Sequence, residues 1–206
     1  MDKLSMSSPT IIVVIGLPGS GKSFFATQFA ETFDAALVSE DKIRWMLFAH
    51  HTYDDNEKTI VKQVSDMMMA ELLKTKKTII LDGGYNDRPA RTTLATSAKK
   101  AGYKILTVVV QTDAPTAERR STKRDARKAG DRYKQSLDAT EFARQAKEYQ
   151  APTRFDKATV VISGKHTYST QARTVLKKIL ETQEPAPAAP QPQPAPIVRP
   201  RGPFVQ

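Results

Sequence analysis

The stretch TIIVVIGLPGSGKS, residues 10–23, decides the fold of this chain. Residues 11–15 are five consecutive β-branched apolar residues, a pattern typical of a short strand that is buried on both faces. The next eight residues fit the phosphate-binding loop G-x-x-x-x-G-K-[ST], which stands between a strand and a helix. Apolar residues at positions 24, 25, 29 and 30 favour a helix that packs on a sheet. This order of strand, loop and helix predicts an α/β fold that binds a nucleoside triphosphate.

Each residue type in the loop suits the binding of phosphate for a chemical reason. Glycine lets backbone N–H groups turn toward a phosphate, because a Cβ would block either the turn or the approach. Lys22 is expected to reach the outer phosphates of ATP, and Ser23 to give its hydroxyl to Mg²⁺. The positive end of the following helix points at the same phosphates. The predicted nucleotide-binding residues of the loop are Gly16, Pro18, Gly19, Ser20, Gly21, Lys22 and Ser23.

Length and composition limit the class of protein. A chain of 206 residues favours one domain with an ordinary core. Cysteine is absent from the sequence, so a disulfide framework and a thiolate metal site are both excluded. No apolar run approaches the roughly 18 residues that span a bilayer, and the early apolar stretch leads into the phosphate-binding loop rather than a cleavage site. We therefore expect a soluble, cytoplasmic protein with no membrane partner.

The net charge of +10 is concentrated in one segment. Residues 115–134 hold eight basic side chains against three acidic ones, a surplus of five charges. Such a concentration favours a polyanionic ligand, either the triphosphate itself or a nucleic acid backbone. We expect a helix here, with Arg120 and Arg124 four residues apart on one face that folds over the triphosphate. The alternative is a solvated basic helix.

Strand and helix patterns alternate along the rest of the chain. Further strands are expected at residues 35–39, 77–84, 103–111 and 158–163. Helices are expected at residues 57–74, 86–101, 138–150 and 169–182, and in a segment that Ser39 opens and that buries Ile43 and Leu47. This alternation specifies a three-layer P-loop NTPase fold, with a five-stranded parallel sheet, helices on both faces and a helical lid. Ligands in such sheets bind beyond the carboxyl ends of the strands.

Three charged residues are expected at that edge of the sheet. Asp41 and Arg44 are three residues apart and share one helical face. The carboxylate there can accept a proton from an attacking hydroxyl while the guanidinium holds an anionic group of the acceptor. The alternative is an exposed ion pair that contributes little stability. Asp82 ends a strand where P-loop proteins place a carboxylate that orients Mg²⁺ or its water; alternatively, it clamps Arg44 in position.

The composition changes abruptly at residue 184. Eight of the thirteen prolines lie in residues 184–206, and this segment is predicted to be a disordered or polyproline II tail. It either docks an unknown protein that has an aromatic-lined groove or serves as an inert tether. The predicted organisation is a flexible N-terminus at 1–9, one domain at 10–183 with a lid at about 115–134, and the Pro-rich tail.

The order of these motifs resembles the P-loop kinases typified by the bacteriophage polynucleotide 5′-kinase, and is similar to the zeta-toxin and chloramphenicol-phosphotransferase group. The resemblance covers approximately residues 10–182 and rests on the phosphate-binding loop, on D-x-x-R at Asp41 and Arg44, on the strand that ends at Asp82, and on two arginines four residues apart. It implies that Asp41 is the general base and that Arg44 binds a phosphate of the acceptor. It also implies that Arg120 and Arg124 stabilise the transferring group.

The reaction implied by the resemblance is transfer of the γ-phosphoryl group from ATP, with Mg²⁺, to a hydroxyl group. A 5′-hydroxyl of a nucleic acid fits the basic surplus, and a small metabolite or nucleotide sugar fits nearly as well. A third possibility is an ATP-controlled binding protein that recruits a partner through its Pro-rich tail. Gly83 and Gly84 stand where the polynucleotide kinase has threonine and asparagine, in a loop that borders the acceptor site. Lys22, Asp41, Arg44, Arg120 and Arg124 are the catalytic residues that this reading implies.

Overall fold

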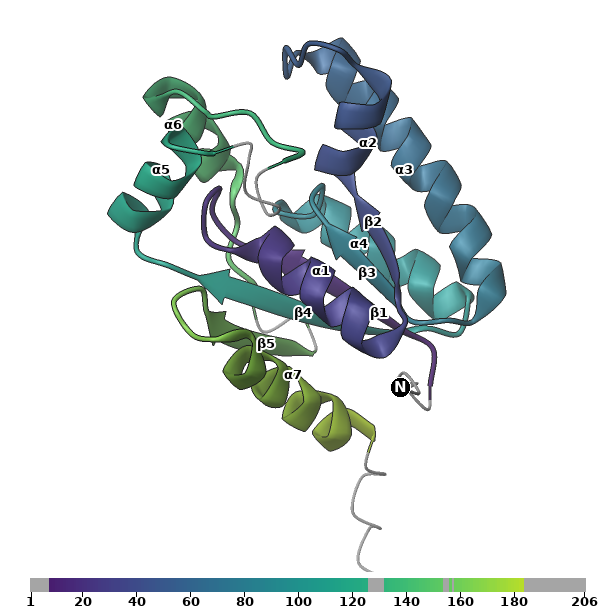
Figure 1. Cartoon of the computed structure of the whole chain (residues 1–206). Coiled ribbons are helices and arrows are strands. Elements are labelled where there is room, and N and C mark those ends of the chain that lie inside the picture. The colour runs from purple at the N-terminus through teal and green to yellow at the C-terminus, as the bar shows by residue number, and fades with distance from the viewer. Residues whose placement is uncertain (1–7, 126–131, 154–155, 157, 184–206) are drawn as a thin grey trace, which may run out of the picture.

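The computed structural model describes residues 8–125, 132–153, 156 and 158–183, which form a five-stranded parallel sheet with helices around it (Figure 1). The strand order is β2-β3-β1-β4-β5. The strands are β1 (Thr10–Ile15), β2 (Ala36–Ser39), β3 (Ile79–Asp82), β4 (Lys104–Gln111) and β5 (Thr159–Ser163). The helices are α1 (Lys22–Phe33), α2 (Glu40–Leu47), α3 (Asp55–Thr75), α4 (Arg88–Lys100), α5 (Ala114–Thr122), α6 (Ala139–Glu148) and α7 (Tyr168–Gln183). The predicted fold class is confirmed.

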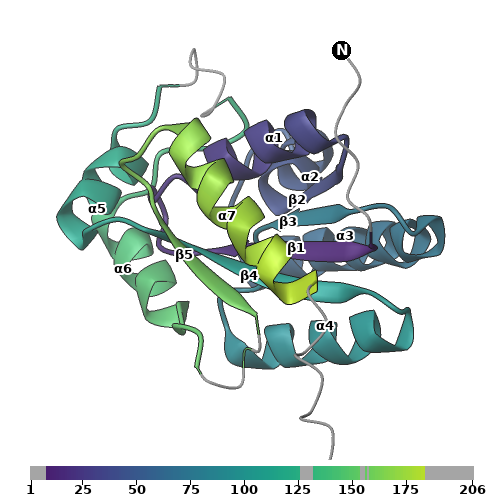
Figure 2. The ribbon, with the colours of Figure 1, turned by 90° about the horizontal axis from the view of Figure 1, so that it is seen from below.

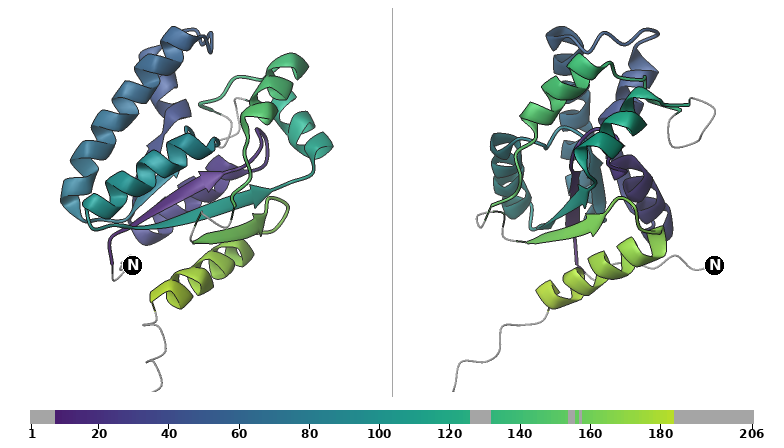
Figure 3. Two further views of the ribbon diagram at one scale, coloured as in Figure 1. Left: turned by 180° about the vertical axis from the view of Figure 1, so that it is seen from behind. Right: turned by 90° about the vertical axis from the view of Figure 1, so that its left-hand side faces the viewer.

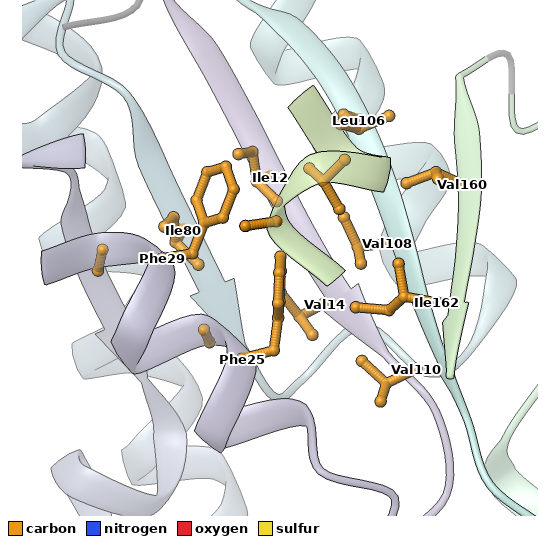
Figure 4. Packing of buried hydrophobic residues seen from close by; sticks show 14 of the residues in the cluster. Ile12, Val14, Phe25, Phe29, Ile80, Leu106, Val108, Val110, Val160 and Ile162 are labelled. Atoms are coloured by element: carbon orange, nitrogen blue, oxygen red, sulfur yellow. The ribbon is translucent and has the colours of Figure 1, made fainter. Parts of the chain in front are cut away.

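The central strand β1 contributes to the core on both faces of the sheet. It pairs in parallel with β3 on one side and with β4 on the other. Ile12 and Val14 join Phe25 and Phe29 of α1 in one apolar cluster, which also includes residues of α7 (Figure 4). Residues 11, 13 and 15 join a second cluster with residues of α2, α3 and α4. A strand covered on both faces needs an apolar residue at every position, and this explains its unbroken apolar pattern.

Two layers of helices enclose the sheet. The view from below shows α1 and α4 on opposite sides of the strands (Figure 2). From behind, α3 and α4 lie in front of the strands (Figure 3). The helices α2 and α5 follow the carboxyl ends of β2 and β4, and they extend beyond that edge of the sheet (Figure 1). The loops and helix starts at this edge are therefore the place for a ligand site.

The buried face of α2 differs from the predicted one. The helix buries Ile43, as expected, but Leu47 is 48% exposed and Arg44 is only 6% exposed. The reason is an ion pair between Arg44 and Glu57 of α3, which directs a charged side chain toward the neighbouring helix. Apolar periodicity does not identify a charged residue as inward-facing, so the sequence pattern predicted the wrong buried face for this helix.

The basic helix is shorter than predicted. It begins after the N-cap residue Asp113, with Pro115 in its first turn, and ends at Thr122. A longer helix would bring several arginines and lysines of residues 119–128 three or four positions apart, and like charges at that spacing repel. Arg124 therefore lies beyond the helix end and does not share a helical face with Arg120. Residues 126–131 of the predicted lid lie outside the described residues.

Parts of both chain ends lie outside the described residues. The predicted flexible N-terminus is described only from residue 8, and the predicted disordered tail at 184–206 lies outside the described residues. The division into these segments stays a prediction. Within the described part of the chain, none of the helices has the length and apolar character needed to cross a bilayer.

Candidate active site

The loop between β1 and α1 is shaped by three glycines. Gly16, Gly19 and Gly21 have φ angles of 145°, 77° and 106°, a region that residues with a Cβ rarely adopt. A Cβ on Gly19 would lie 2.0 Å from the carbonyl oxygen of Ala117, so glycine also lets the loop pack against α5. Gly21 is the N-cap of α1 and has no side chain to cap it. The first turn of α1 therefore offers its N–H groups to an anion, which is the arrangement that binds phosphate.

The other loop residues support this shape. Pro18 and Gly19 line the cavity in front of the loop. Ser20 is fully buried, and its carbonyl oxygen accepts a hydrogen bond of 3.1 Å from Thr112 Oγ1 at the end of β4. Gly164 packs against the same backbone, since a Cβ there would lie 1.9 Å from the Ser20 carbonyl oxygen. The turns after β4 and β5 thus hold the phosphate-binding loop from one side.

Lys22 folds back across its own loop. Its Nζ donates to the carbonyl oxygens of Gly16 and Leu17, at 2.9 and 2.7 Å. Burial and the neighbouring positive charge of Lys134 lower the pKa of Lys22 to about 8. A charged group in so poorly solvated a place is stabilised by an anion, and the loop is built to bring one there.

Asp41 and Arg44 form the ion pair that their spacing predicted. Arg44 Nη1 lies 3.2 Å from Asp41 Oδ1, with the Asp41 side chain 31% exposed and that of Arg44 nearly buried. On its other side, Arg44 Nε lies 2.6 Å from Glu57 Oε1, and the guanidinium carbon lies 4.7 Å from the centre of the Tyr53 ring. Two carboxylates and one aromatic ring therefore hold the guanidinium in place.

Asp82 bonds to Ser39 and not to Arg44, the partner that the sequence analysis considered. Ser39 and Asp82 are register partners on β2 and β3, and Ser39 Oγ donates to Asp82 Oδ2 at 3.2 Å. Glu57, and not Asp82, holds Arg44 in position. Orienting Mg²⁺ or its water therefore remains the proposed role of Asp82. Ser39 also stands at the N-cap of α2, but its hydroxyl bonds to Asp82 rather than capping the helix.

The residues at this edge suit Mg²⁺ bound together with phosphate. Ser23 and Asp82 line the same cavity and offer the oxygen donors that Mg²⁺ prefers. Across the described ranges, no group of three or more acidic or histidine side chains could hold a metal ion. Mg²⁺ commonly keeps its waters and binds through one or two protein oxygens and the substrate phosphates, so this small donor set fits it.

Lys134 joins the loop to the carboxylate. Its Nζ contacts Ser23 Oγ and lies 3.4 Å from Asp41 Oδ2. Burial raises the pKa of Asp41, but the positive charges of Lys134 and Arg44 outweigh this and hold that pKa below its usual value. Asp41 is therefore ionised near neutral pH and can act as a proton acceptor. The sequence analysis did not identify Lys134 as a site residue, because its contact with Ser23 spans 111 positions of the chain.

The two predicted lid arginines lie in different places. Arg120 is exposed on α5, and its Nη1 donates to the carbonyl oxygen of Gly164 at 3.2 Å. Arg124 lines the cavity in front of the loop, and its charge acts on Lys22 and Asp41. The helix end at Thr122 separates them, so the prediction that both share one helical face is wrong.

The loop after β3 is shaped by a neighbouring carboxylate. A Cβ on Gly84 would lie 2.1 Å from Glu40 Oε1, so the glycines leave room for this side chain. Burial raises the pKa of Glu40 to about 7. Asn86 was expected to open α4, but Asp87 is the N-cap, and Asn86 bonds instead to the backbone N–H and carbonyl of Gly16 at 3.2 and 3.3 Å.

These residues surround one cavity of about 240 Å³ at the carboxyl edge of the sheet. Its donor side is the phosphate-binding loop, and its other side includes Arg44, Tyr53, Lys58 and residues of α6. Arg144 of α6 is held there by Glu141 and Glu148. The cavity can therefore hold a phosphate chain on one side of Asp41 and a polar or anionic acceptor on the other.

Known proteins resemble this chain in its domain and in its fold. A family model described as an AAA domain matches residues 11–152. No curated protein matches the sequence.

Solved structures share the fold at low sequence identity. Kti12 from Chaetomium thermophilum, solved in complex with ADP-AlF3, is 21% identical, with a TM-score of 0.61 over 83% of this chain and 97% of that chain. The Mycobacterium tuberculosis APS kinase CysC, in complex with AMPPNP and APS, is 18% identical, with a TM-score of 0.59 over 84% and 98%. A chain of the Pnkp1/Rnl/Hen1 RNA repair complex is 19% identical, with a TM-score of 0.58 over 74% of this chain and 46% of that one. At these identities the likeness concerns the fold.

Proposed function

This chain belongs to the AAA domain family and has the P-loop kinase fold, and on that basis we propose that it is an ATP-dependent kinase with a hydroxyl acceptor. One observation supports this most strongly. The Asp41 carboxylate lies between the phosphate-binding loop, which it reaches through Lys134 and Ser23, and the buried guanidinium of Arg44. A carboxylate between these two groups can accept the proton of a hydroxyl that attacks the last phosphate, and this supports the proposal.

The proposed mechanism uses mostly positioned charges. Lys22 and the N–H groups at the start of α1 bind the phosphate chain, and Arg124 adds positive charge at the transferring group. Asp41 accepts the proton of the attacking hydroxyl, while Arg44 binds an anionic group of the acceptor and fixes its orientation. Ser23 and Asp82 would hold Mg²⁺, which neutralises charge on the β- and γ-phosphates when it is bound.

We infer a 5′-hydroxyl of a nucleic acid as the acceptor. The buried guanidinium of Arg44 suits a phosphate, and the surplus of five positive charges at residues 115–134 suits a polyanion. A small-molecule or nucleotide-sugar acceptor is the second candidate. It is favoured by the modest volume of the cavity, about 240 Å³, and by the residues of α6 that border it.

The test is transfer of label from γ-labelled ATP in the presence of Mg²⁺. One arm contains 5′-hydroxyl oligonucleotides, a second contains the same oligonucleotides already phosphorylated at the 5′ end, and a third contains a pool of small metabolites. We expect label on the 5′-hydroxyl oligonucleotides alone, with transfer that weakens steeply as salt is added. Label on a metabolite would show that the acceptor is a small molecule and not a nucleic acid. ATP hydrolysis that no acceptor alters would overturn the kinase proposal.

A further inference from the structure

An aromatic pair lies on the surface beside the proposed active site. The rings of Trp45 on α2 and Tyr133 meet edge to face, with their centroids 5.3 Å apart and their planes at 79°. Trp45 is 44% exposed, although burial of so large an apolar side chain would be favourable. We call Trp45 and Tyr133 the aromatic platform. An exposed platform of this size suggests a ligand with a flat apolar face.

Positive charges surround the aromatic platform. The guanidinium carbon of Arg132 lies 5.8 Å from the centre of the Trp45 ring and 5.7 Å from that of Tyr133. The Nζ of Lys42 lies 5.4 Å from the centre of the Tyr133 ring. Aromatic rings next to cations match a nucleobase joined to phosphates, because the rings stack on the base and the cations attract the backbone.

The aromatic platform lies close to the proposed catalytic carboxylate in two segments of the chain. Asp41 and Trp45 are four residues apart on α2, so they lie on one face, a single turn from each other. Two adjacent residues before α6 contact the same two side chains of α2. Tyr133 contacts Trp45, and Lys134 contacts Asp41. A ligand that places a hydroxyl at Asp41 therefore has the aromatic platform within about one nucleotide of its reacting end.

A second cavity lies beside Tyr133 and Asp41, and Trp45 is not among its lining residues. It has a volume of about 250 Å³, and Asp41, Lys42, Tyr133 and Lys134 are among its lining residues. Asp41 and Lys134 also line the cavity in front of the phosphate-binding loop. The Asp41 side chain therefore borders both cavities.

In-line transfer separates the acceptor from the base of ATP. The leaving group departs on the side opposite to the attacking hydroxyl, so the ADP portion extends away from Asp41. The aromatic platform lies on the Asp41 side, beyond β2 at one edge of the sheet. The platform is thus placed for the acceptor and not for the donor nucleotide.

We propose that Trp45 stacks against a base near the 5′ end of a single-stranded nucleic acid acceptor, with the Tyr133 ring meeting the Trp45 ring edge to face and Lys42 and Arg132 next to the phosphates of the acceptor. This inference rests on the proposed function, and it names the residues that recognise the acceptor at that site.

The first experiment uses the full chain and its own fluorescence. Trp45 is the only tryptophan in the sequence, so tryptophan emission reports on the aromatic platform alone. Titration with a 5′-hydroxyl single-stranded oligonucleotide, without ATP, is expected to quench this emission. An oligonucleotide with abasic sites at its first three positions is expected to quench much less. Quenching by ATP and not by oligonucleotide would overturn the proposal, and so would equal quenching by both oligonucleotides.

The second experiment measures phosphate transfer by variants. We expect Trp45→Ala to raise the KM for the oligonucleotide about 5- to 100-fold, the range for loss of one stacked base, with little change in kcat or in the KM for ATP. Trp45→Phe should restore most of the affinity because it keeps a ring. Met46→Ala is the matched control, since Met46 is the next residue on α2 and is 67% exposed.

The outcomes separate this inference from the function on which it rests. Oligonucleotide phosphorylation with an unchanged KM in Trp45→Ala would refute the aromatic platform and leave the kinase proposal standing. Label transfer only to a small metabolite would refute the platform and the nucleic acid acceptor together. If emission responds only to an added protein and not to oligonucleotides, the platform is a protein-binding surface and the proposal is wrong.

Discussion

Arg44 and Glu57 form an ion pair inside the protein, with 2.6 Å between Nε and Oε1 and with side chains that are 7% and 3% exposed. The pair links α2 to the start of α3. Glu57 is itself held by Thr52, whose backbone N–H donates to Oε2 at 2.7 Å. Burying two charges is costly, so the pair contributes less to net stability than its geometry suggests. Its clearer effect is to fix the direction of the guanidinium at the acceptor side of the cavity.

Removal of Glu57 should destabilise the protein and misplace Arg44. We expect Glu57→Ala to lower the free energy of unfolding by about 3 kcal/mol, because among the described residues it leaves the buried Arg44 with Asp41 as its remaining ion-pair partner. The measurement is urea unfolding. Glu71→Ala is the matched control, because Glu71 pairs with Lys74 on the surface of the same helix and should cost less than about 1 kcal/mol. Equal losses for the two variants would mean that the buried pair does not hold Arg44.

The local patterns of the sequence were sufficient for the strands, the phosphate-binding loop and the Asp41–Arg44 pair. Each of these depends on neighbours within a few positions, where alternation or helical spacing carries the information. The loop at residues 16–23 is a clear case, since its glycines have the positive φ angles that the motif requires.

The contacts that complete the site come from distant parts of the chain. Lys134 lies 111 positions from Ser23, and Asn86 lies 70 positions from Gly16. A single sequence carries no periodic signal for such pairs, because they depend on how loops meet at the sheet edge. The wrong pairing of Arg120 with Arg124 has a different, local cause, since the prediction continued the helix to Arg124 whereas α5 ends at Thr122.

Asp41 should be needed for turnover and not for ATP binding. We expect Asp41→Asn to lower kcat on the order of 10²-fold or more, the scale for loss of a general base, with ATP affinity near that of the unchanged protein. Asp66→Asn, an exposed aspartate on α3, is the control and should keep full activity. Steady-state kinetics and calorimetry provide the two readouts. Turnover by Asp41→Asn at the wild-type rate would remove Asp41 from the mechanism.

Protonation of Asp41 should not limit the reaction near neutral pH. Burial raises the pKa of Asp41, but the charges of Lys134 and Arg44 outweigh this effect and hold the pKa below the ordinary value of an aspartate. The contribution of the ionised carboxylate to turnover is therefore present at neutral and mildly acidic pH, and it is lost only when the pH falls through this lowered pKa. A profile of kcat against pH checks this, if the protein is shown by circular dichroism to remain folded. A loss of turnover near pH 7 that is absent from Glu40→Gln would point to Glu40, because burial raises the pKa of that carboxyl to about 7.

ATP binding should take up a proton at mildly alkaline pH. The pKa of Lys22 is lowered to about 8 by burial and by Lys134, so the free protein loses this charge as the pH rises through 8. Bound phosphates favour the ammonium form and raise its pKa, which means that binding becomes weaker above pH 8, on the order of tenfold per pH unit. Calorimetry at pH 8.5 in buffers of different ionisation enthalpy measures the uptake. Lys22→Arg, which stays charged, should show none. Equal heats in all buffers for the unchanged protein would contradict this linkage.

Gly19 and Gly102 allow the role of the phosphate-binding loop to be separated from backbone strain. Their φ angles are 77° and 73°, so alanine at either position should incur a similar left-handed strain of about 1–2 kcal/mol. A Cβ on Gly19 would lie 2.0 Å from the carbonyl oxygen of Ala117, a backbone atom, whereas a Cβ on Gly102 has its nearest neighbour at 3.9 Å. We expect Gly102→Ala to lose stability only and to bind ATP normally. Gly19→Ala should lose more stability and also bind ATP at least tenfold more weakly, because the loop must move away from α5. Urea unfolding and calorimetry measure the two effects, and unaltered ATP binding by Gly19→Ala would show that the contact between the loop and α5 does not shape the phosphate site.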